Sequence, residues 1–304
     1  MIRQFDSLLQ MIEAFPDEQT CIDHLRAIRW KDGAYCPHCG SNKVYHFSDQ
    51  RTHKCGDCRQ RFSIKVGTIV EDTKLPLRKW FIAIWLITSH KKGVASTQLA
   101  KDLKITQKSA WFVLHRLRYA ARTKSFAAPL EGDVKVDETY IGGKEGNKPA
   151  SKRKQIGRGG IGKAIVMGAI ERQVEVEARV VKNTTKETME KFVDSAISPN
   201  VTSLSTDEHS GYRRLGMKYP HGVVRHGKKE YVSGNTHAQA IDGYWWQLKR
   251  QIIGIHHWIL ANHLDRYVAK SFWRYNARGV REGNRVNDLI AHATGHLTYK
   301  ALIS

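Results

Sequence analysis

The chain has 304 residues, and its 50 lysines and arginines outnumber its 29 acidic residues, which gives a net charge of +21. With 41% hydrophobic residues it can bury the cores of two or three domains, which argues against intrinsic disorder. The longest apolar run, residues 80–87, is far shorter than the roughly 18 residues that span a bilayer, and the N-terminus lacks the apolar region of a signal peptide. We therefore expect a soluble intracellular protein. The excess positive charge favours a polyanionic partner over a merely soluble basic protein, because binding phosphates releases condensed counterions.

Four of the five cysteines form two pairs, Cys36-x-x-Cys39 and Cys55-x-x-Cys58, separated by fifteen residues. This is the spacing of a zinc ribbon, in which two tight turns each supply two thiolates to one tetrahedral Zn²⁺. A pair of disulfides is the alternative, but nothing else in the chain indicates an oxidising compartment. Four thiolates close the coordination sphere, so the sequence predicts a structural zinc that holds a small module together.

A helix-turn-helix is predicted next along the chain. Residues 77–89 are apolar at nearly every position and indicate a buried helix. Residues 96–118 have apolar spacing typical of two helices, with Ser96 and Thr106 as the expected N-caps, although Lys104 stands where such turns often carry glycine. A helical hairpin that binds no DNA has the same pattern. In a DNA-binding motif the second helix enters the major groove, so the expected DNA contacts on it are Gln107, Lys108, Trp111 and Arg116.

Strands dominate the region that follows. Residues 133–141 alternate in polarity as a strand, and residues 163–170 and 174–181 predict a hairpin. Between them lies a glycine-rich basic loop, which we expect to clamp DNA backbone through Lys152, Arg153, Lys154 and Arg158. Thr184 and Glu187 form a capping-box pattern ahead of a helix, and a final long helix is expected at about residues 236–253.

The order strand, strand, strand, helix, strand, helix is that of a ribonuclease-H-like fold. Asp137 lies in the first strand, Asp207 ends the fourth, and Asp242 lies on the final helix. Because the first and fourth strands are neighbours in such a sheet, these acids can share Mg²⁺ or Mn²⁺ ions, as phosphoryl transfer on DNA requires. Lys249 follows two helical turns after Asp242 and can hold a DNA phosphate, as can the neighbouring Arg250. The alternative for any single acid is a solvated surface position, which we favour for Glu138 and Glu208.

The predicted fold class is a multidomain α+β protein in which a zinc ribbon and a helix-turn-helix precede a ribonuclease-H-like α/β domain with a mixed sheet. The predicted boundaries are a helical segment at 1–30, the ribbon at 31–70, the helix-turn-helix at 74–124, the catalytic domain at 130–280 and a C-terminal tail at 281–304.

These features together resemble bacterial insertion-sequence transposases of the ISXO-like group, which join a zinc ribbon and a helix-turn-helix to a DDE catalytic core. The resemblance covers nearly the whole chain. The motifs that carry it are the two cysteine pairs, QLAKDLKITQKSAW at 98–111, VDETYIGGK at 136–144, TDEHSGY at 206–212, IDGYWWQLKR at 241–250 and RYNAR at 274–278.

The resemblance implies that Asp137, Asp207 and Asp242 are the catalytic, metal-binding acids and that Lys249 assists them. It implies a cytoplasmic, nucleoid-associated enzyme that binds the terminal inverted repeats of its element and target DNA as at least a dimer, and that cleaves and transfers DNA strands. The chain departs from the family at Asp242, where the third acid is usually glutamate, and at Lys135 and Lys270, where acids are common. A DNA-binding regulator with a weakened core is therefore the alternative, and a related nuclease without transposition is a third.

Overall fold

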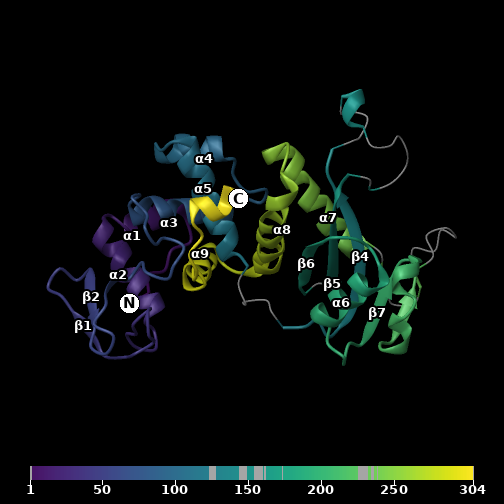
Figure 1. Ribbon diagram of the computed structural model, residues 1–304, viewed down its shortest axis with the longest axis horizontal. Helices are drawn as coiled ribbons and strands as arrows, with labels where there is room; N and C mark the ends of the chain where they lie inside the picture. Colours follow the sequence, from purple (N-terminus) through teal and green to yellow (C-terminus); the bar gives the residue numbers. More distant parts are fainter. Residues whose placement is uncertain are drawn as a thin grey trace. The chain divides into compact units, whose positions relative to one another are not determined.

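In a computed structural model the chain forms two compact units, Met1–Thr123 with Gly279–Ser304, and Lys124–Arg278 (Figure 1). The structure describes residues 2–122, 128–143, 149–153, 160, 162–172, 174–224, 232–233, 236–237 and 239–303. The predicted loop residues Lys154 and Arg158, and the side chain of Lys152, lie outside this described part.

The first unit joins a small three-stranded sheet to a set of helices. Its sheet has the order β1-β2-β3, with both pairs antiparallel. The elements are β1 (Val44–His46), β2 (Thr52–Cys55), β3 (Arg61–Ser63), α1 (Leu8–Ala14), α2 (Glu18–Arg29), α3 (Leu77–Ser89), α4 (Ser96–Leu103), α5 (Gln107–Ala120), α9 (Glu282–Ala291) and α10 (Tyr299–Ile303). The helix predicted at residues 77–89 is confirmed as α3, and its apolar side chains are buried.

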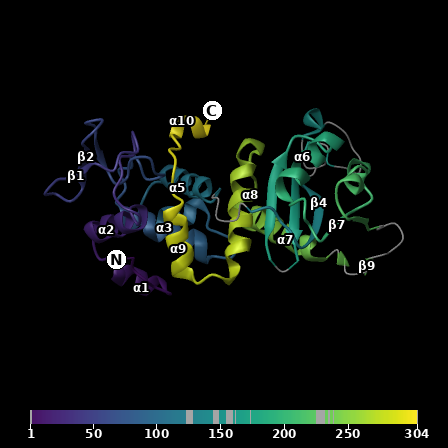
Figure 2. The same ribbon diagram turned by 90° about the horizontal axis from the view of Figure 1, so that it is seen from below.

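The last residues of the chain, treated above as a tail, pack within this first unit. Helix α9 contacts α2 and α3 (Figure 2) and buries an apolar face of Val286, Leu289 and Ile290. Gly283 permits this approach, because a Cβ atom there would lie 1.9 Å from the carbonyl oxygen of Phe5. The apolar face of α9 is buried against two helices from the first third of the sequence.

The predicted turn between two helices is present, with one change at its start. The hydroxyl of Thr106 accepts a hydrogen bond from the backbone N–H of Ser109 over 3.2 Å, which confirms the cap of α5. The expected cap at Ser96 is wrong: Ala95 is the N-cap of α4, and the Ser96 hydroxyl instead accepts from the Gln107 amide over 2.9 Å. Lys104 adopts the left-handed conformation (φ 48°, ψ 60°) in which such turns favour glycine.

The second unit is built on a five-stranded sheet with the order β6-β5-β4-β7-β8. The strands are β4 (Asp133–Ile141), β5 (Ala164–Glu171), β6 (Val176–Val181), β7 (Ser203–Thr206) and β8 (His221–Val223). The β4, β5 and β6 strands run antiparallel, whereas β7 lies parallel to β4 and β8 parallel to β7. A meander of three strands followed by two parallel ones is the ribonuclease-H-like arrangement, so the predicted fold class is confirmed.

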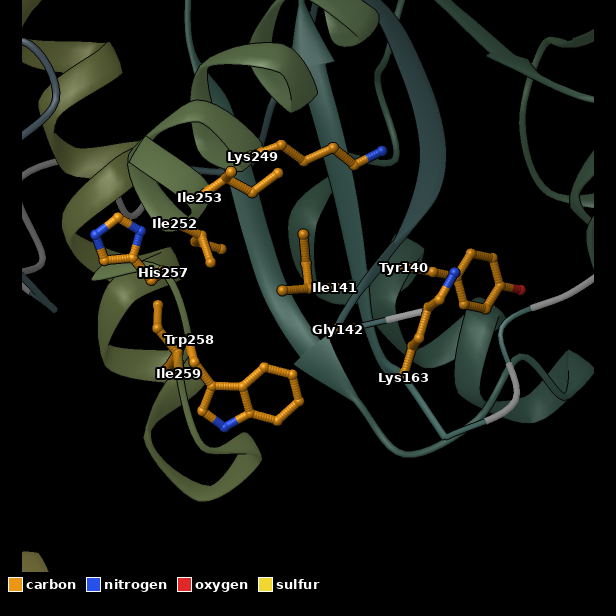
Figure 3. Close-up of a pocket in the computed structure, with 11 residues that line it drawn as sticks. Tyr140, Ile141, Gly142, Lys163, Lys249, Ile252, Ile253, His257, Trp258 and Ile259 are labelled. Atoms are coloured by element: carbon orange, nitrogen blue, oxygen red, sulfur yellow. The ribbon is translucent and has the colours of Figure 1, made fainter. Parts of the chain in front are cut away.

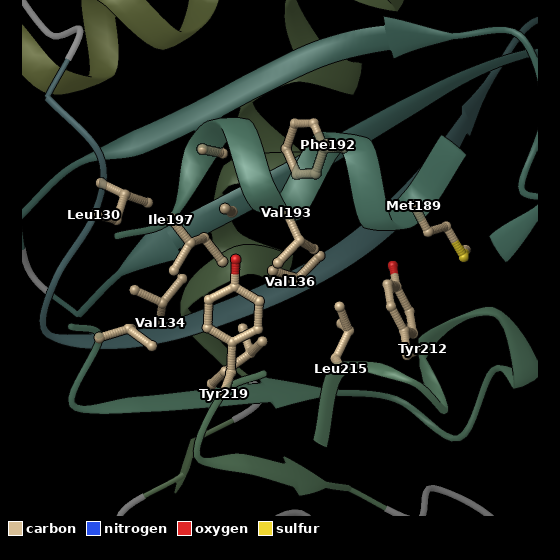
Figure 4. Packing of buried hydrophobic residues seen from close by; sticks show 14 of the residues in the cluster. Leu130, Val134, Val136, Met189, Phe192, Val193, Ile197, Tyr212, Leu215 and Tyr219 are labelled. Atoms are coloured by element: carbon tan, nitrogen blue, oxygen red, sulfur yellow. The ribbon is translucent and has the colours of Figure 1, made fainter. Parts of the chain in front are cut away.

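Helices cover both faces of this sheet. Successive side chains of β4 point to opposite faces, so they enter two separate cores. On one face Val134 and Val136 pack under α6 (Lys186–Ala196), with Phe192 and Val193 of that helix above them (Figure 4). On the other face the core includes α7 (Gln239–Gln251) and α8 (Ala261–Asn276). Each odd-numbered residue in the middle of β4 therefore faces α7 and α8.

Two local predictions in this unit need correction. Helix α6 begins one residue later than the capping box requires: Thr185 is the N-cap, and its side chain makes no capping hydrogen bond. The long helix expected at 236–253 is interrupted at both ends. Short strands β9 (Val232–Ser233) and β10 (Thr236–His237) precede α7, and a π-helix at Ile252–His256 follows it.

Short 3-10 turns complete the elements, at Ala150–Lys152, Ser210–Tyr212, Leu215–Met217 and Ala277–Gly279. Among the described residues, no helix has the length and apolar character needed to cross a membrane.

Candidate active site and metal centre

Asp137 lies in the middle of the central strand β4, on the face covered by α7. The indole N–H of Trp245 on that helix donates a hydrogen bond of 2.9 Å to Oδ2 of Asp137. Burial raises the pKa of Asp137, and the Trp245 N–H and the nearby Lys135 ammonium oppose that rise. The carboxylate is thus half-buried, and the Trp245 N–H fixes its orientation. Burial makes its ionised form unfavourable unless a nearby positive charge compensates it.

Asp207 follows directly after β7, the parallel neighbour of β4. Every aligned pair between these strands is 70 positions apart, from Asp133 with Ser203 to Lys135 with Ser205. Continuing the same register places Asp207 opposite Asp137. One carboxylate oxygen of Asp207 accepts a hydrogen bond of 3.0 Å from the backbone N–H of His209, and its charge contributes to the raised pKa of Asp137. The structure therefore brings together the first two predicted acids.

Glu138 is the acid that sequence reasoning misplaced. It was expected on the surface, but it is half-buried and accepts a hydrogen bond of 2.9 Å from the hydroxyl of Tyr212. Burial raises its pKa, and the charges of Asp207 and Asp137 add to that rise. The only sequence signal was the acidic doublet at positions 137 and 138. Glu208, by contrast, is exposed as expected.

Asp242 and Lys249 both lie on α7, as predicted. Among the described residues, no hydrogen bond joins either side chain to Asp137 or Asp207. Asp242 is exposed and lies three residues before Trp245, hence on the same side of the helix. The described residues hold two groups of potential metal ligands whose donor atoms all lie within 4.8 Å, and the three aspartates are not one of them. Lys249 is half-buried and lines a pocket at the end of β4.

The carboxylates have the chemistry that a hard divalent cation requires. Such cations bind oxygen ligands, and Asp137 and Asp207 supply carboxylate oxygens from adjacent strands. Burial raises the pKa of Asp137, so a cation there would offset the cost of its charge. Glu138 lies on the opposite face of β4 from Asp137, so it is not part of this pair.

The four cysteines form the ligand set of a zinc ribbon. Their sulfur atoms lie within 4.8 Å of one another, and the Cys36–Cys58 and Cys39–Cys55 pairs are each 3.6 Å apart. A tetrahedral Zn²⁺ with bonds of about 2.3 Å separates its sulfur ligands by about 3.8 Å, whereas a disulfide requires about 2.05 Å. All four are free thiols, so the disulfide alternative is excluded.

Backbone groups also support this arrangement of thiolates. The N–H of His38 points at the sulfur of Cys36, and the N–H of Cys58 points at that of Cys55, each over 3.4 Å. The module buries few apolar side chains, mainly Phe62 beside Cys36 and Cys55. A core this small is typical of modules that a structural metal holds together.

The start of helix α5 presents the predicted DNA-contact residues in part. Gln107 and Lys108 are exposed at its first turn. Tyr299 of α10, which the sequence did not single out, lies over this helix: the Lys108 ammonium is 4.7 Å from its ring centroid, and Trp111 lies edge-on to it at 6.5 Å. The C-terminal residues therefore contribute to the same surface.

Arg116 does not lie on that surface, contrary to expectation. It is 4% exposed, and its guanidinium donates to the backbone carbonyls of Leu297, Ile69 and Glu71 at 2.8–2.9 Å. Its position on α5 points into the first unit, where it binds three chain segments together. It is a structural residue.

Two further predicted contacts, Arg153 and Arg250, are exposed. Arg153 lies just after the turn at Ala150–Lys152. Arg250 lies over the ring of Trp246, 5.3 Å from its centroid, on the outer side of α7. Both are accessible to a large anionic partner.

Comparisons with known proteins agree with this anatomy. The family profile described as "ISXO2-like transposase domain" matches residues 129–276, and that described as "Transposase zinc-ribbon domain" matches residues 16–61. A protein in transposable element ISH50 of Halobacterium salinarum is 26% identical over 271 residues, which span 84% of this chain and 90% of the relative. A pre-cleavage Mos1 transpososome structure gives a TM-score of 0.27 at 13% identity, covering 75% of this chain and 82% of that one, which is too low to bear on the fold.

Proposed function

Because the chain belongs to the ISXO2-like transposase family, we propose that it binds the terminal inverted repeats of its element and catalyses metal-dependent cleavage and transfer of DNA strands. The observation that carries this proposal is the placement of Asp137 on β4 and of Asp207 directly after β7, the parallel neighbour of β4 in a ribonuclease-H-like sheet.

The reaction has two phosphoryl-transfer steps. In the first, water attacks a phosphodiester at the element end, a P–O bond breaks, and a 3′-hydroxyl is released. In the second, that hydroxyl attacks a target phosphodiester, forms a new P–O bond and displaces a target 3′-oxygen. Both steps transfer phosphorus directly between oxygens, so no bond to the protein forms.

The chain supplies positioning for these steps. Asp137, Asp207 and Asp242 would hold Mg²⁺ or Mn²⁺, which activates the attacking oxygen and stabilises the leaving one. Trp245 fixes the Asp137 carboxylate from the covered face, and the backbone N–H of His209 orients Asp207. Lys249, two turns beyond Asp242 on α7, would hold a DNA phosphate beside the acids.

Recognition is assigned to the first unit. The exposed start of α5 would read base edges in the major groove through Gln107 and Lys108, and the ribbon would track the backbone. The net charge of +21 supports the phosphate contacts. Two element ends must be joined, so we expect at least a dimer on DNA.

One observation favours a second candidate, a transposase-derived DNA-binding regulator. The third acid is the shorter aspartate, it is exposed, and it does not join Asp137 and Asp207 in a compact ligand group. A chain with this arrangement could retain end binding while cutting poorly.

The test is cleavage of duplexes carrying the element's own ends, with Mg²⁺ or Mn²⁺, by wild type, Asp137→Asn and Asp242→Glu. The matched control is Glu208→Gln, which neutralises an exposed acid next to Asp207. The proposal requires cleavage by wild type and the control but not by Asp137→Asn. End binding without cleavage by wild type, together with cleavage by Asp242→Glu, identifies the regulator. Absence of both binding and cleavage rejects both functions.

A further inference from the structure

A pocket of about 650 Å³ opens at the end of β4 (Figure 3). Lys249 lines it, whereas the proposed catalytic acids Asp137, Asp207 and Asp242 do not. Its wall comes from the end of β4, the residue before β5, the end of α7, the π-helix and the segment after it. In Figure 3 Ile141 lies between Lys249 on one side and the indole of Trp258 on the other. None of the described residues that line it is acidic.

The described wall of the pocket carries positive charge. Lys163, just before β5, and Lys249, on α7, both line it. Within the described residues neither ammonium group has a hydrogen-bond or ion-pair partner. Two ammonium groups in a concave site, with no carboxylate among the described lining residues, favour an anion such as a phosphate.

Apart from His257, the other described side chains of the wall are apolar or aromatic. Trp258 is 58% exposed despite its size, and Tyr140 is also exposed at the rim. Gly143 makes room for the indole, because a Cβ atom there would lie 3.0 Å from Cζ3 of Trp258. An exposed indole beside unpaired lysines offers a stacking surface next to a phosphate site.

An unusual backbone path presents Trp258 in this position. The π-helix Ile252–His256 ends at His257, which has φ 56° although it is not glycine. π-helical turns and positive-φ residues are costly, and they cluster at functional sites. Continuing α7 as a regular helix would carry Trp258 elsewhere.

We infer that this pocket binds one unpaired nucleotide of a DNA strand, with its base stacked on Trp258 and its phosphate held by Lys163 and Lys249. The inference rests on the proposed function for the identity of the polyanion, and it adds that a base leaves the duplex stack near the acids. Base stacking uses the exposed indole of the wall, and the phosphate contact uses its two ammonium groups.

The test uses full-length protein and DNA carrying 5-iodouracil, which forms photo-crosslinks to adjacent aromatic side chains. One substrate is a single-stranded oligonucleotide, and the other is a set of duplex ends with the probe at successive positions around the cut. We expect crosslinks to the peptide containing Trp258 from the single strand, and from one or two positions of the duplex. Trp258→Ala should abolish them, Trp258→Phe should retain them, and the control Leu260→Ala, an exposed residue outside the lining, should leave them unchanged.

Measuring the affinity for the single strand distinguishes the contribution of the Trp258 stacking surface from that of the lysines that hold the phosphate. Trp258→Ala should weaken binding on the order of 10-fold without changing its salt dependence. Lys163→Gln should lower the slope of log affinity against log salt by about 1, because one phosphate contact is lost. Crosslinks at other residues, with wild-type affinity for Trp258→Ala, would overturn the inference.

Two further arms keep this result separate from the proposed function. Cleavage of the duplex ends, measured in parallel, reports on catalysis whatever the single-strand result. Free 5-iodo-deoxyuridine monophosphate tests for a small-molecule site. If it crosslinks to Trp258 as efficiently as the oligonucleotide does, the pocket binds free nucleotides and the assignment to a DNA strand is wrong.

Discussion

The indole N–H of Trp245 donates a hydrogen bond of 2.9 Å to Oδ2 of Asp137, which joins helix α7 to the central strand of the sheet. Trp245 is 4% exposed, whereas its neighbour Trp246 is 64% exposed. The motif around Asp242 therefore contributes a residue, Trp245, that orients the Asp137 carboxylate.

Trp245→Phe should shift the acidic limb of the cleavage pH profile to higher pH. The N–H donor stabilises the ionised carboxylate and opposes the rise in the Asp137 pKa that burial causes. Without it, that pKa rises further, and more of the enzyme is protonated at a given pH. We expect a cleavage rate about 10-fold lower at neutral pH, as for loss of about 1.4 kcal/mol of positioning energy. Trp246→Phe is the control and should leave the profile in place.

Arg116→Lys should destabilise the first unit while leaving the DNA-contact surface intact. Arg116 is buried and donates to three backbone carbonyls, and a lysine cannot satisfy all of them. We expect a loss of about 3 kcal/mol of unfolding free energy in denaturant titrations. Lys108→Gln, at the exposed start of α5, should weaken DNA binding without that loss. Equal stability of wild type and Arg116→Lys would contradict the structural role.

Removing zinc should unfold the ribbon and leave the second unit folded. The ribbon buries only a small apolar cluster around Cys36, Cys55 and Phe62, and zinc typically supplies about 10 kcal/mol or more to such modules. Hydrogen exchange after treatment with a chelator should show lost protection at residues 36–63 and retained protection in β4 and β5. Unchanged exchange in the ribbon would show that the metal is dispensable.

Lys104→Gly should stabilise the first unit. Lys104 has φ 48°, a conformation that costs about 1 kcal/mol for residues with a Cβ atom. Relief of this strain should raise the melting temperature by about 2–4 °C. Lys101→Gly is the matched control, because position 101 lies inside α4 and glycine there should lower stability by about 1 kcal/mol. A fall in stability for Lys104→Gly would show that the lysine side chain outweighs the backbone strain.

Local patterns predicted much of the fold. The alternation of β4 gave its bounds, 133–141, and the apolar run gave α3, because each pattern reflects burial of neighbouring residues. The ligand set of the ribbon followed from cysteine spacing alone. The pairing of Asp137 with Asp207 followed from the order of the strands.

Features that depend on distant contacts could not be predicted. Glu138 and Tyr212 are 74 positions apart, and only the folded structure shows that the Tyr212 hydroxyl donates a hydrogen bond to the Glu138 carboxylate. The burial of Arg116 depends on the Leu297 carbonyl, 181 positions away. The π-helix after α7 likewise has no local sequence signal, since its residues continue the helical pattern that precedes it.

The central claim is that Asp137 binds a catalytic divalent cation, and replacing its carboxylate by a thiol tests this most directly. Mg²⁺ requires oxygen ligands, whereas Mn²⁺ tolerates sulfur better. Asp137→Cys should therefore fail to cleave element ends in Mg²⁺ and should recover cleavage in Mn²⁺. The ratio of its cleavage rate in Mn²⁺ to that in Mg²⁺ should exceed the same ratio for wild type by at least about 10-fold. Cleavage by Asp137→Cys in Mg²⁺ at the wild-type rate would contradict the claim.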